Sequence, residues 1–355
     1  MRSNDAYMII DLQYGSTGKG LMAGYMAETY EPDVVMHAWG PNAGHTYINR
    51  DGRKFIHCML HNGIVSPKFK YGLIGPGACV SLPILVKEME DSIDLLMGKE
   101  ILIHPHAAIV QDRHIIAEGG NMVGIGSTRK GTGAALIEKI LRQPQGDIVA
   151  YSFKDKVEML ANEYGIPMKV CTQSEYNMIV DGARLIQVEG SQGYSLGISS
   201  GFYPYTTSRE CTPAQLASDV LLPLPAIRQI VGCMRTYPIR VANRYDEQGA
   251  MVGWSGPCYP DQVEISFEAI GQSQELTTVT KLPRRLFTFS RMQTADALRQ
   301  TRPTDVVIGF ANYCKSQSEL GDIIDVVDNY AKHFGCGGVS WATVGPTFND
   351  VKEFL

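Results

Sequence analysis

The sequence predicts an α/β fold: one large domain, residues 1–355, built on a mostly parallel, doubly wound sheet with hairpin insertions. Short apolar runs typical of buried parallel strands recur along the chain. Segments with the hydrophobic period of a helix lie between them, and this alternation favours a parallel sheet covered by helices. We find no repeat or linker that divides the 355 residues, which suffice for a large core.

The predicted elements begin with a strand at 6–10, a glycine-rich loop and a helix at 21–30. Asp51-Gly52 separates 46–50 from 54–58 and predicts a β-hairpin. The clearest helix spans 82–96, where apolar residues recur every three or four positions. The other predicted strands are 33–37, 101–104, 185–188, 306–310 and 339–342, and the other helices are 154–164 and 319–334.

The composition narrows the class of protein. A net charge of −5 argues against an extended surface for nucleic acid or anionic membranes. The 8 cysteines include no C-x-x-C pair, so we expect reduced thiols rather than a metal cage or disulfide framework. The first residues lack the apolar core of a signal peptide. We therefore expect a cytoplasmic protein without nucleic-acid or membrane partners.

The most informative stretch runs from Asp11 to Gly20 and reads D-L-Q-Y-G-S-T-G-K-G. A strand, a glycine loop and a helix in this order form an anion cradle, because backbone N–H groups and the helix N-terminus face the phosphates. The Walker pattern requires Ser or Thr after the lysine, whereas Gly20 follows Lys19. The stretch thus predicts a P-loop-NTPase-like phosphate site that lacks the Walker motif itself.

Further segments add polar groups that can bind or react. W-G-P-N-A-G-H-T at 39–46 contains His45, which titrates near neutral pH and can act as an acid or an electrostatic stabiliser. Taken alone, a loop histidine is more often structural. Segment 125–133 carries hydroxyls and cations before a helix, typical of a phosphate loop or, equally, of a basic surface loop. Segments 188–193, 203–208 and 235–241 alone fit a strand end or a surface turn.

In their collinear order, these segments resemble the adenylosuccinate synthetase family. The corresponding family patterns are Q-W-G-D-E-G-K-G, N-A-G-H-T, I-G-T-T-G-R-G-I-G, F-E-G-A-Q-G and T-Y-P-Y-V-T-S. The resemblance implies the adenylosuccinate synthetase fold, a homodimer, and a ligase that requires Mg²⁺. In such enzymes a donor nucleotide phosphorylates O6 of a purine, and L-aspartate then displaces that phosphate.

The resemblance also implies roles for individual residues. His45 is implied to be catalytic, Ser16 takes the place of the loop carboxylate, and Ser16 and Gly44 are implied to contact Mg²⁺. The residues implied to bind the donor nucleotide are Gly15, Thr17, Gly18, Lys19, Gly20, Asn312, Gly345 and Pro346. Those implied to bind the substrate nucleotide are Ser16, Asn42, Thr128, Arg142, Gln192, Thr207, Val241 and Leu282, with Arg142 reaching across the homodimer interface. Thr280 and Arg284 are implied to bind aspartate.

Three positions depart from the family pattern. Ser16 replaces the aspartate that lies against purine C2; a smaller neutral group leaves room for a 2-amino group and can accept a hydrogen bond from it. Leu282 replaces an arginine near the ribose, which favours a sugar without the 2′-hydroxyl. Asn312 replaces the aspartate that reads guanine, and its amide can meet the donor–acceptor edge of adenine.

All three changes predict one reaction. We expect ligation of L-aspartate to C6 of dGMP through a 6-phosphoryl intermediate, with ATP or dATP as phosphate donor, giving N6-succino-2-amino-dAMP. Two alternatives stay open: an ordinary adenylosuccinate synthetase that uses IMP and GTP, and an inactive nucleotide-binding regulator. Asp11, the substrate phosphate and water are the options for the base that replaces the missing carboxylate.

Overall fold

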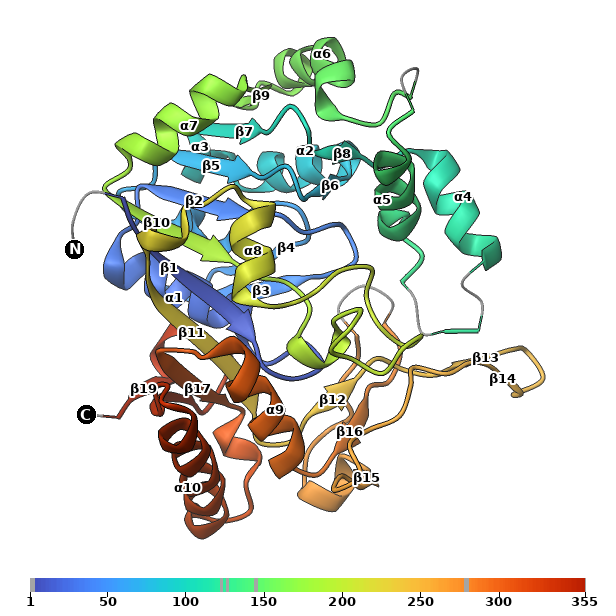
Figure 1. Cartoon of the computed structure of the whole chain (residues 1–355), viewed down its shortest axis with the longest axis vertical. Coiled ribbons are helices and arrows are strands. Elements are labelled where there is room, and N and C mark those ends of the chain that lie inside the picture. Colours follow the sequence, from blue (N-terminus) through green and yellow to red (C-terminus); the bar gives the residue numbers. More distant parts are fainter. Residues whose placement is uncertain (1–3, 122–123, 126–127, 144–145, 278–280, 355) are drawn as a thin grey trace.

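A computed structural model describes the chain except residues 1–3, 122–123, 126–127, 144–145, 278–280 and 355. Its centre is a 10-stranded sheet (Figure 1). The strands, in spatial order, are β19 (Val351–Glu353), β18 (Val339–Thr343), β17 (Asp305–Gly309), β11 (Ile227–Arg235), β1 (Asp5–Asp11), β10 (Leu185–Glu189), β2 (Val34–His37), β5 (Tyr71–Ile74), β7 (Glu100–Ile103) and β9 (Met168–Val170). Every neighbouring pair is parallel except β18 and β19, so the predicted mostly parallel sheet is confirmed.

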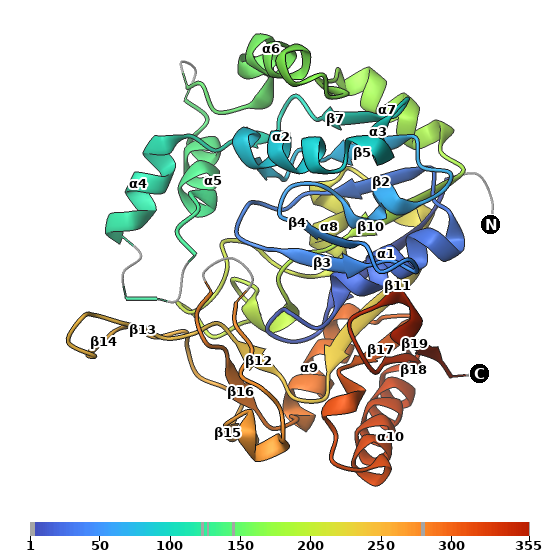
Figure 2. The same ribbon diagram turned by 180° about the vertical axis from the view of Figure 1, so that it is seen from behind.

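Helices cover both faces of this sheet. They are α1 (Lys19–Tyr30), α2 (Leu82–Asp91), α3 (Ile93–Leu96), α4 (Asp112–Asn121), α5 (Thr132–Leu141), α6 (Lys154–Tyr164), α7 (Gln173–Gly182), α8 (Pro213–Asp219), α9 (Arg291–Thr301) and α10 (Gln317–Phe334). Figure 1 shows α7 and α8 on one face, and Figure 2 shows α2 on the other.

Alternate residues of the central strands pack into different hydrophobic clusters. On β2, Val35 packs with Leu85 of α2, whereas Val34 and Met36 pack with Val180 of α7. Because side chains alternate across a strand, a strand that is buried on both faces reads as a continuous apolar run. The predicted doubly wound arrangement is confirmed, and the six predicted strands all lie in this one sheet.

One predicted helix differs in detail from the structure, and the predicted hairpin is confirmed. The helix expected over 82–96 is broken at Ser92, whose φ of −120° and ψ of 18° are not helical. The predicted hairpin is confirmed as β3 (His45–Ile48) and β4 (Lys54–His57), in which His45 pairs with His57. At its tip, Gly52 has a φ of 83°, a conformation that glycine adopts without steric cost.

Smaller elements complete the fold. Three short strands form one sheet, β12 (Ile239–Arg240), β16 (Arg285–Phe287) and β15 (Glu264–Ile265). Two further pairs are β13 (Arg244–Tyr245) with β14 (Met251–Gly253), and β6 (Cys79–Val80) with β8 (Ala108–Ile109). The 3₁₀ turns are η1 (Asn62–Val65), η2 (Ala150–Phe153), η3 (Tyr194–Leu196), η4 (Leu224–Ala226), η5 (Glu268–Ile270), η6 (Ala311–Tyr313) and η7 (Phe348–Asp350).

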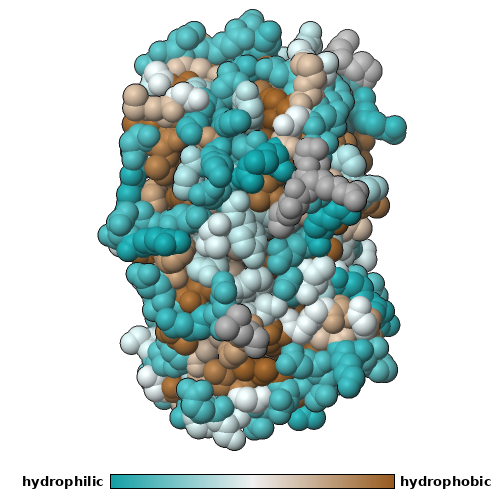
Figure 3. Space-filling view, turned by 90° about the vertical axis from the view of Figure 1, so that its left-hand side faces the viewer, coloured by the Kyte–Doolittle hydropathy of each residue, from teal (hydrophilic) through white to brown (hydrophobic). Residues whose placement is uncertain are grey.

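The surface is mixed in character. On the face drawn in Figure 3, hydrophobic residues form patches that are separated by hydrophilic ones. Over the part of the chain that the structure describes, none of the helices combines the length and apolar character needed to span a bilayer.

Candidate active site

A cavity with a volume of about 450 Å³ lies beside the carboxyl ends of the parallel strands. Its lining comes from the chain that follows β1, β2, β10, β11, β17 and β18. In open α/β sheets, ligands bind at this edge, because the connecting loops converge there. The motifs that the sequence analysis singled out are far apart in the chain and meet at this cavity.

Most predicted site residues line this cavity. They are Gly15, Ser16, Gly18, Lys19, Gly20, Asn42, Gly44, His45, Thr128, Gln192, Val241, Leu282, Arg284, Asn312, Gly345 and Pro346. Thr17, Arg142 and Thr207 do not line it. Thr280, expected to bind aspartate, falls outside the described residues.

The phosphate loop is built from left-handed backbone. Gly15, Ser16 and Gly18 have φ values of 90°, 57° and 96°, and α1 begins directly afterwards at Lys19. A side chain at Gly20 would bring Cβ to 2.7 Å from the backbone oxygen of Thr46. This close approach requires glycine where the Walker motif has a hydroxyl residue, which explains physically why that motif fails here.

The buried carboxylate of Asp11 fixes the conformation of this loop. Its Oδ2 accepts from Lys19 Nζ at 2.7 Å and from Thr17 Oγ1 at 2.5 Å, and its Oδ1 accepts from the backbone N–H groups of Gln13 and Gly15. Lys19 Nζ also donates to the backbone oxygen of Gln192 at 2.8 Å. Asp11 is buried and does not line the cavity, so its carboxylate shapes the loop and directs the Thr17 hydroxyl inward.

His45 begins β3 at the cavity wall. Its ring lies edge-on to the indole of Trp39, with 4.5 Å between the centroids, and Trp39 Nε1 donates to the backbone oxygen of Cys58 at 2.9 Å. Burial lowers the pKa of His45 to about 3, and the charges of Lys19 and His57 add to this effect. In this structure the imidazole is therefore neutral at pH 7.

A buried cluster that the sequence analysis did not predict adjoins the cavity. Arg235 is fully buried, and its Nη2 donates to Glu275 Oε1 at 2.5 Å. Tyr313 donates to the same oxygen at 2.8 Å, and Arg284 Nε lies 3.9 Å from Oε2. Arg235 Nη1 also reaches the backbone oxygen of Ser16 at 3.3 Å. The cluster thus joins the phosphate loop to the arginine expected to bind aspartate.

Glu275 is the single acidic residue among the described residues that line the cavity. Burial pushes its pKa up, but the charges of Arg235 and Arg284 and the hydrogen bonds from Arg235 and Tyr313 together outweigh burial, so its net pKa is lowered. Glu275 is therefore an ionised counter-charge for arginines. The signal for this cluster was weak in the sequence, where Arg235 stood out only as the first residue of R-T-Y-P-I-R-V.

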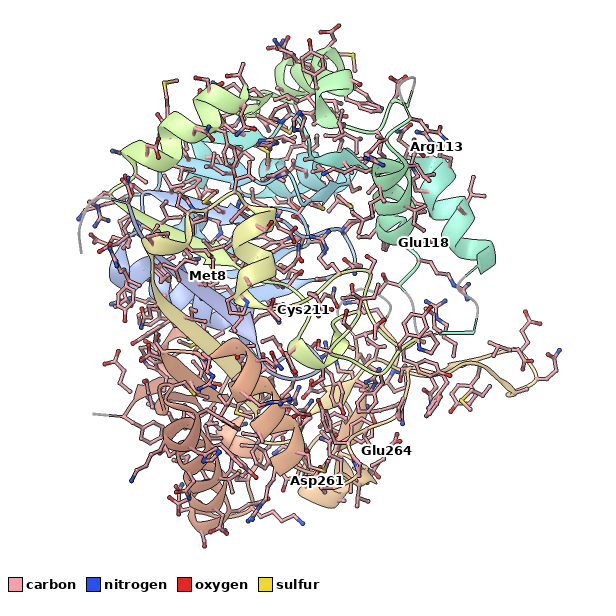
Figure 4. The ribbon with its side chains drawn as sticks, viewed as in Figure 1. Met8, Arg113, Glu118, Cys211, Asp261 and Glu264 are labelled. Atoms are coloured by element: carbon pink, nitrogen blue, oxygen red, sulfur yellow. The ribbon has the colours of Figure 1, made fainter. Side chains whose placement is uncertain are left out.

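The second phosphate-type loop is anchored by Glu118 of α4. Figure 4 labels Glu118 near α4 and α5. Its carboxylate accepts from the backbone N–H groups of Gly131 and Gly133 at 2.7 and 2.6 Å. The loop leads into α5, and Arg142 follows the last residue of this helix, exposed and with a left-handed φ of 52°. Arg142 therefore lies at the surface, away from the cavity of its own chain.

The residues expected to contact Mg²⁺ fit one particular kind of site. No group of three or more His, Cys, Asp or Glu side chains able to hold a metal occurs in the described ranges. Ser16 and Gly44 line the cavity and offer neutral oxygens, while the Asp11 carboxylate is already engaged by Lys19. Mg²⁺ in nucleotide sites is bound largely by phosphates and water, with few protein ligands. These oxygens therefore suit a metal that arrives with the donor nucleotide.

Known proteins match this chain over nearly its whole length. The N6-succino-2-amino-2′-deoxyadenylate synthase of Acinetobacter phage SH-Ab 15497 is 53% identical over 341 residues, which cover 91% of this chain and 88% of the relative. The synthase of the same name from Salmonella phage PMBT28 is 51% identical, with coverages of 99% and 98%.

Solved structures agree with these matches. The succinoaminodeoxyadenylate synthetase of cyanophage S-2L, bound to dGMP and to dATP as an energy donor, superposes with a TM-score of 0.87 and 40% identity, covering 99% of this chain and 96% of that chain. The adenylosuccinate synthetase of Plasmodium falciparum, at 17% identity and a TM-score of 0.75, covers 98% of this chain and 99% of that chain and supports the fold alone. The model of the family described as adenylosuccinate synthetase matches residues 8–181 and 149–330. The chain belongs to the adenylosuccinate synthetase family.

Proposed function

We propose that this protein is a ligase that joins L-aspartate to C6 of dGMP, using ATP or dATP, and that it releases N6-succino-2-amino-dAMP. The donor phosphorylates O6, and the aspartate amine then displaces phosphate at C6. Phage relatives at 51–53% identity that carry the name of this activity support the proposal, as does the cyanophage relative bound to dGMP and dATP.

Ser16 carries the choice of purine. It lines the cavity on the strained loop between Gly15 and Gly18, at the position where the family pattern has aspartate. A hydroxyl there leaves space for the 2-amino group of guanine and accepts a hydrogen bond from it. A carboxylate would clash with that 2-amino group, so serine in place of aspartate favours dGMP over IMP.

Asn312 carries the choice of donor. It lies in η6, after the carboxyl end of β17, and lines the cavity together with Gly345 and Pro346. The amide offers both a donor and an acceptor, which match the Watson–Crick edge of adenine. We therefore propose an adenine donor, ATP or dATP.

Mg²⁺ is proposed to accompany the donor, with the Ser16 hydroxyl and the Gly44 carbonyl as protein ligands. When bound, the metal neutralises phosphate charge as the phosphoryl group transfers. Lys19 supplies a further positive charge at the loop. His45 is proposed to stabilise charge that develops on O6, and Arg284 is proposed to hold an aspartate carboxylate, aided by Thr280.

We further propose a homodimer in which Arg142 reaches the monophosphate of the partner's substrate, beside Asn42, Thr128 and Thr207 of that other chain's site. Arg142 follows the last residue of α5, and the neighbouring helices α4 and α5 expose several aliphatic side chains. These are Ile115, Ile116, Ile137, Ile140 and Leu141, which are 43%, 75%, 59%, 63% and 59% exposed. Exposed apolar surface of this kind is typical of protein–protein contacts.

Product analysis tests the proposed function. The protein is incubated with dGMP, L-aspartate, Mg²⁺ and ATP or dATP, and the nucleotides are identified by mass spectrometry. The proposal predicts N6-succino-2-amino-dAMP together with ADP or dADP and phosphate. Product from IMP and GTP but not from dGMP would assign the ordinary family reaction instead. No product from either mixture would indicate a nucleotide-binding protein without activity.

A further inference from the structure

Phe310 holds an unusual backbone conformation at the cavity. It directly follows β17, and its φ of 59° places a large side chain in the left-handed region, where bulky residues are rare. The conformation is held on two sides: Thr236 Oγ1 donates to the Phe310 backbone oxygen at 2.8 Å, and Tyr313 N–H donates to the same oxygen at 2.9 Å. Backbone strain that is fixed in this way clusters at ligand sites.

The ring of Phe310 rests on a buried cation. The Arg235 guanidinium lies 3.7 Å from the ring centroid, and Arg235 is fully buried and paired with Glu275. The Tyr313 ring meets Phe310 edge-on, with 5.2 Å between centroids. The aromatic plane is therefore fixed before any ligand binds, and Phe310 is at the same time a lining residue of the cavity.

We propose that Phe310 is the stacking surface for the purine base of the phosphate donor, with Arg235 as its support. The inference rests on the proposed function and adds a specificity-determining residue to it. A purine face stacks on an aromatic ring, and a cation behind that ring draws electron density away from the stacked face.

The neighbours of Phe310 decide which base stacks on it. Phe310 immediately precedes η6, which carries Asn312, and its N–H donates to Thr343 Oγ1 at 3.3 Å. Thr343 ends β18 and leads directly to Gly345 and Pro346. These are the segments proposed for the donor. Asn42, Thr128 and Val241, proposed for the substrate nucleotide, lie in other parts of the chain.

The test compares Michaelis constants for three substrates. Phe310→Asn removes the ring but suits the left-handed backbone, which asparagine tolerates. Stacking on an aromatic residue accounts for on the order of a 10-fold change in affinity or more, so the KM for ATP should rise by at least about that factor. The KM values for dGMP and aspartate should stay within about 2-fold. Phe310→Tyr, which keeps the aromatic face, should retain a near wild-type KM for ATP.

Inhibition by inorganic tripolyphosphate is the matched ligand control. This probe has the donor's phosphates but no base, so Phe310→Asn should leave its inhibition constant unchanged. Phe334→Leu is the matched protein control and should leave the KM for ATP unchanged. Phe334 is also half-buried, and the guanidinium of Arg302 lies 5.4 Å from its ring centroid, but Phe334 does not line the cavity. Should the asparagine variant fail to fold, Phe310→Gly, which favours positive φ, carries the same expectation.

An unchanged KM for ATP in Phe310→Asn would overturn the inference, as would a rise confined to dGMP, which would place the ring against the substrate purine. A parallel loss of tripolyphosphate inhibition would assign Phe310 a purely structural role and would also overturn it. If the wild-type protein makes no product from dGMP, the proposed function itself fails. If it makes the product and Phe310→Asn leaves the KM for ATP unchanged, the inference alone fails.

Discussion

The carboxylate of Asp11 lies 2.7 Å from the ammonium of Lys19, and both side chains are buried beneath the phosphate loop. The same carboxylate accepts from Thr17 and from two backbone N–H groups, so one residue at the end of β1 fixes the loop and its lysine together. Asp11 was one option for the missing base. Its engagement with Lys19 and its absence from the cavity lining make it a structural residue instead.

Asp11→Asn should strongly destabilise the protein. The change leaves Lys19 as an unpaired buried charge, and breaking a buried pair in this way costs about 3–5 kcal/mol. The free energy of unfolding in urea measures the loss. Asp94→Asn is the control, because its pair with Arg53 is solvent-exposed and such pairs contribute about 0–1 kcal/mol. Equal losses in the two variants would contradict a dominant role for Asp11 in the loop.

Ser16→Asp should move the substrate preference from dGMP towards IMP. The backbone φ of 57° at this position is one that aspartate tolerates, so the loop can keep its shape. A carboxylate there clashes with the 2-amino group, and the ratio of kcat/KM between the two nucleotides should change by about 10- to 200-fold. Ser16→Ala, which lacks the hydroxyl but adds no bulk, should lower kcat/KM for dGMP without improving IMP. A serine-to-aspartate variant that still prefers dGMP would argue against this reading of Ser16.

Asn312→Asp should weaken the use of ATP and improve the use of GTP. Aspartate is acceptor-only when ionised, so it suits the N1–H and 2-amino donors of guanine and cannot donate to adenine. Initial rates with each donor at fixed dGMP and aspartate measure the change. Asn349→Asp, at an exposed position outside the cavity, controls for the added charge. Faster turnover of the wild-type protein with GTP than with ATP would show that Asn312 does not select adenine.

Stability should fall as the pH drops below about 6.5. Burial lowers the pKa of the histidines near the site: to about 3 for His45 and His61, to about 4 for His57, and well below 6.5 for His37. In the unfolded chain these groups take up protons below pH 6.5, whereas in the folded chain they do so only at much lower pH. Each therefore removes roughly 1.4 kcal/mol of stability per pH unit within that window.

Two buried carboxylates act in the opposite direction. Burial raises the pKa of Glu189 to about 7 and also raises that of Glu88, so the folded protein keeps these protons at a pH where the unfolded chain has lost them. Their stabilising contribution to the free energy of unfolding grows as the pH falls towards 4.5. The destabilising contribution of the four histidines is larger than that of these two carboxylates. Urea unfolding at pH 7.5 and 5.5 should show a lower free energy of unfolding at pH 5.5. His61→Asn should make this difference smaller. A stability that rises between these pH values on acidification would contradict the assignment.

Arg142 and His45 should complement each other across the proposed dimer. His45→Ala should lower kcat by about 10²–10⁴-fold, because a neutral imidazole positioned to meet charge on O6 is lost. Arg142→Ala should be nearly inactive yet folded. In a mixture, a heterodimer has one site with both intact residues, and random exchange makes about half of the dimers mixed, so about a quarter of all sites should work. No recovery after demonstrated subunit exchange would place Arg142 outside the partner's site.

Local patterns could be predicted from the sequence, and long-range clusters could not. The loop at Gly15 to Gly20 could be predicted because left-handed backbone requires glycine at particular positions. The central strands could be predicted because burial on both faces gives continuous apolar runs without polar alternation. The strand β11 was missed, since it carries polar residues such as Gln229, whose side chain donates to Asp305 of the neighbouring strand at 2.9 Å.

The cluster around Glu275 shows what sequence reasoning lacks. Glu275, Arg235 and Tyr313 come from three separate segments, and nothing in their local sequence marks them as partners. Phe310 likewise reads as part of an apolar strand, although it lies just past the strand end with a positive φ. Only the fold brings these residues to the carboxyl edge of the sheet, where they adjoin residues that the family resemblance had already indicated.

The specificity for the purine nucleotide is the central claim, and a comparison of kcat/KM for dGMP, GMP and IMP tests it most directly. The measurement uses the wild-type protein with aspartate, Mg²⁺ and saturating ATP. We predict that dGMP exceeds both rivals, because Ser16 admits the 2-amino group that IMP lacks and Leu282 offers no partner for the 2′-hydroxyl of GMP. Each of these two contacts should change the ratio of kcat/KM between the nucleotides by about 10- to 200-fold. A higher kcat/KM for IMP than for dGMP would contradict the account.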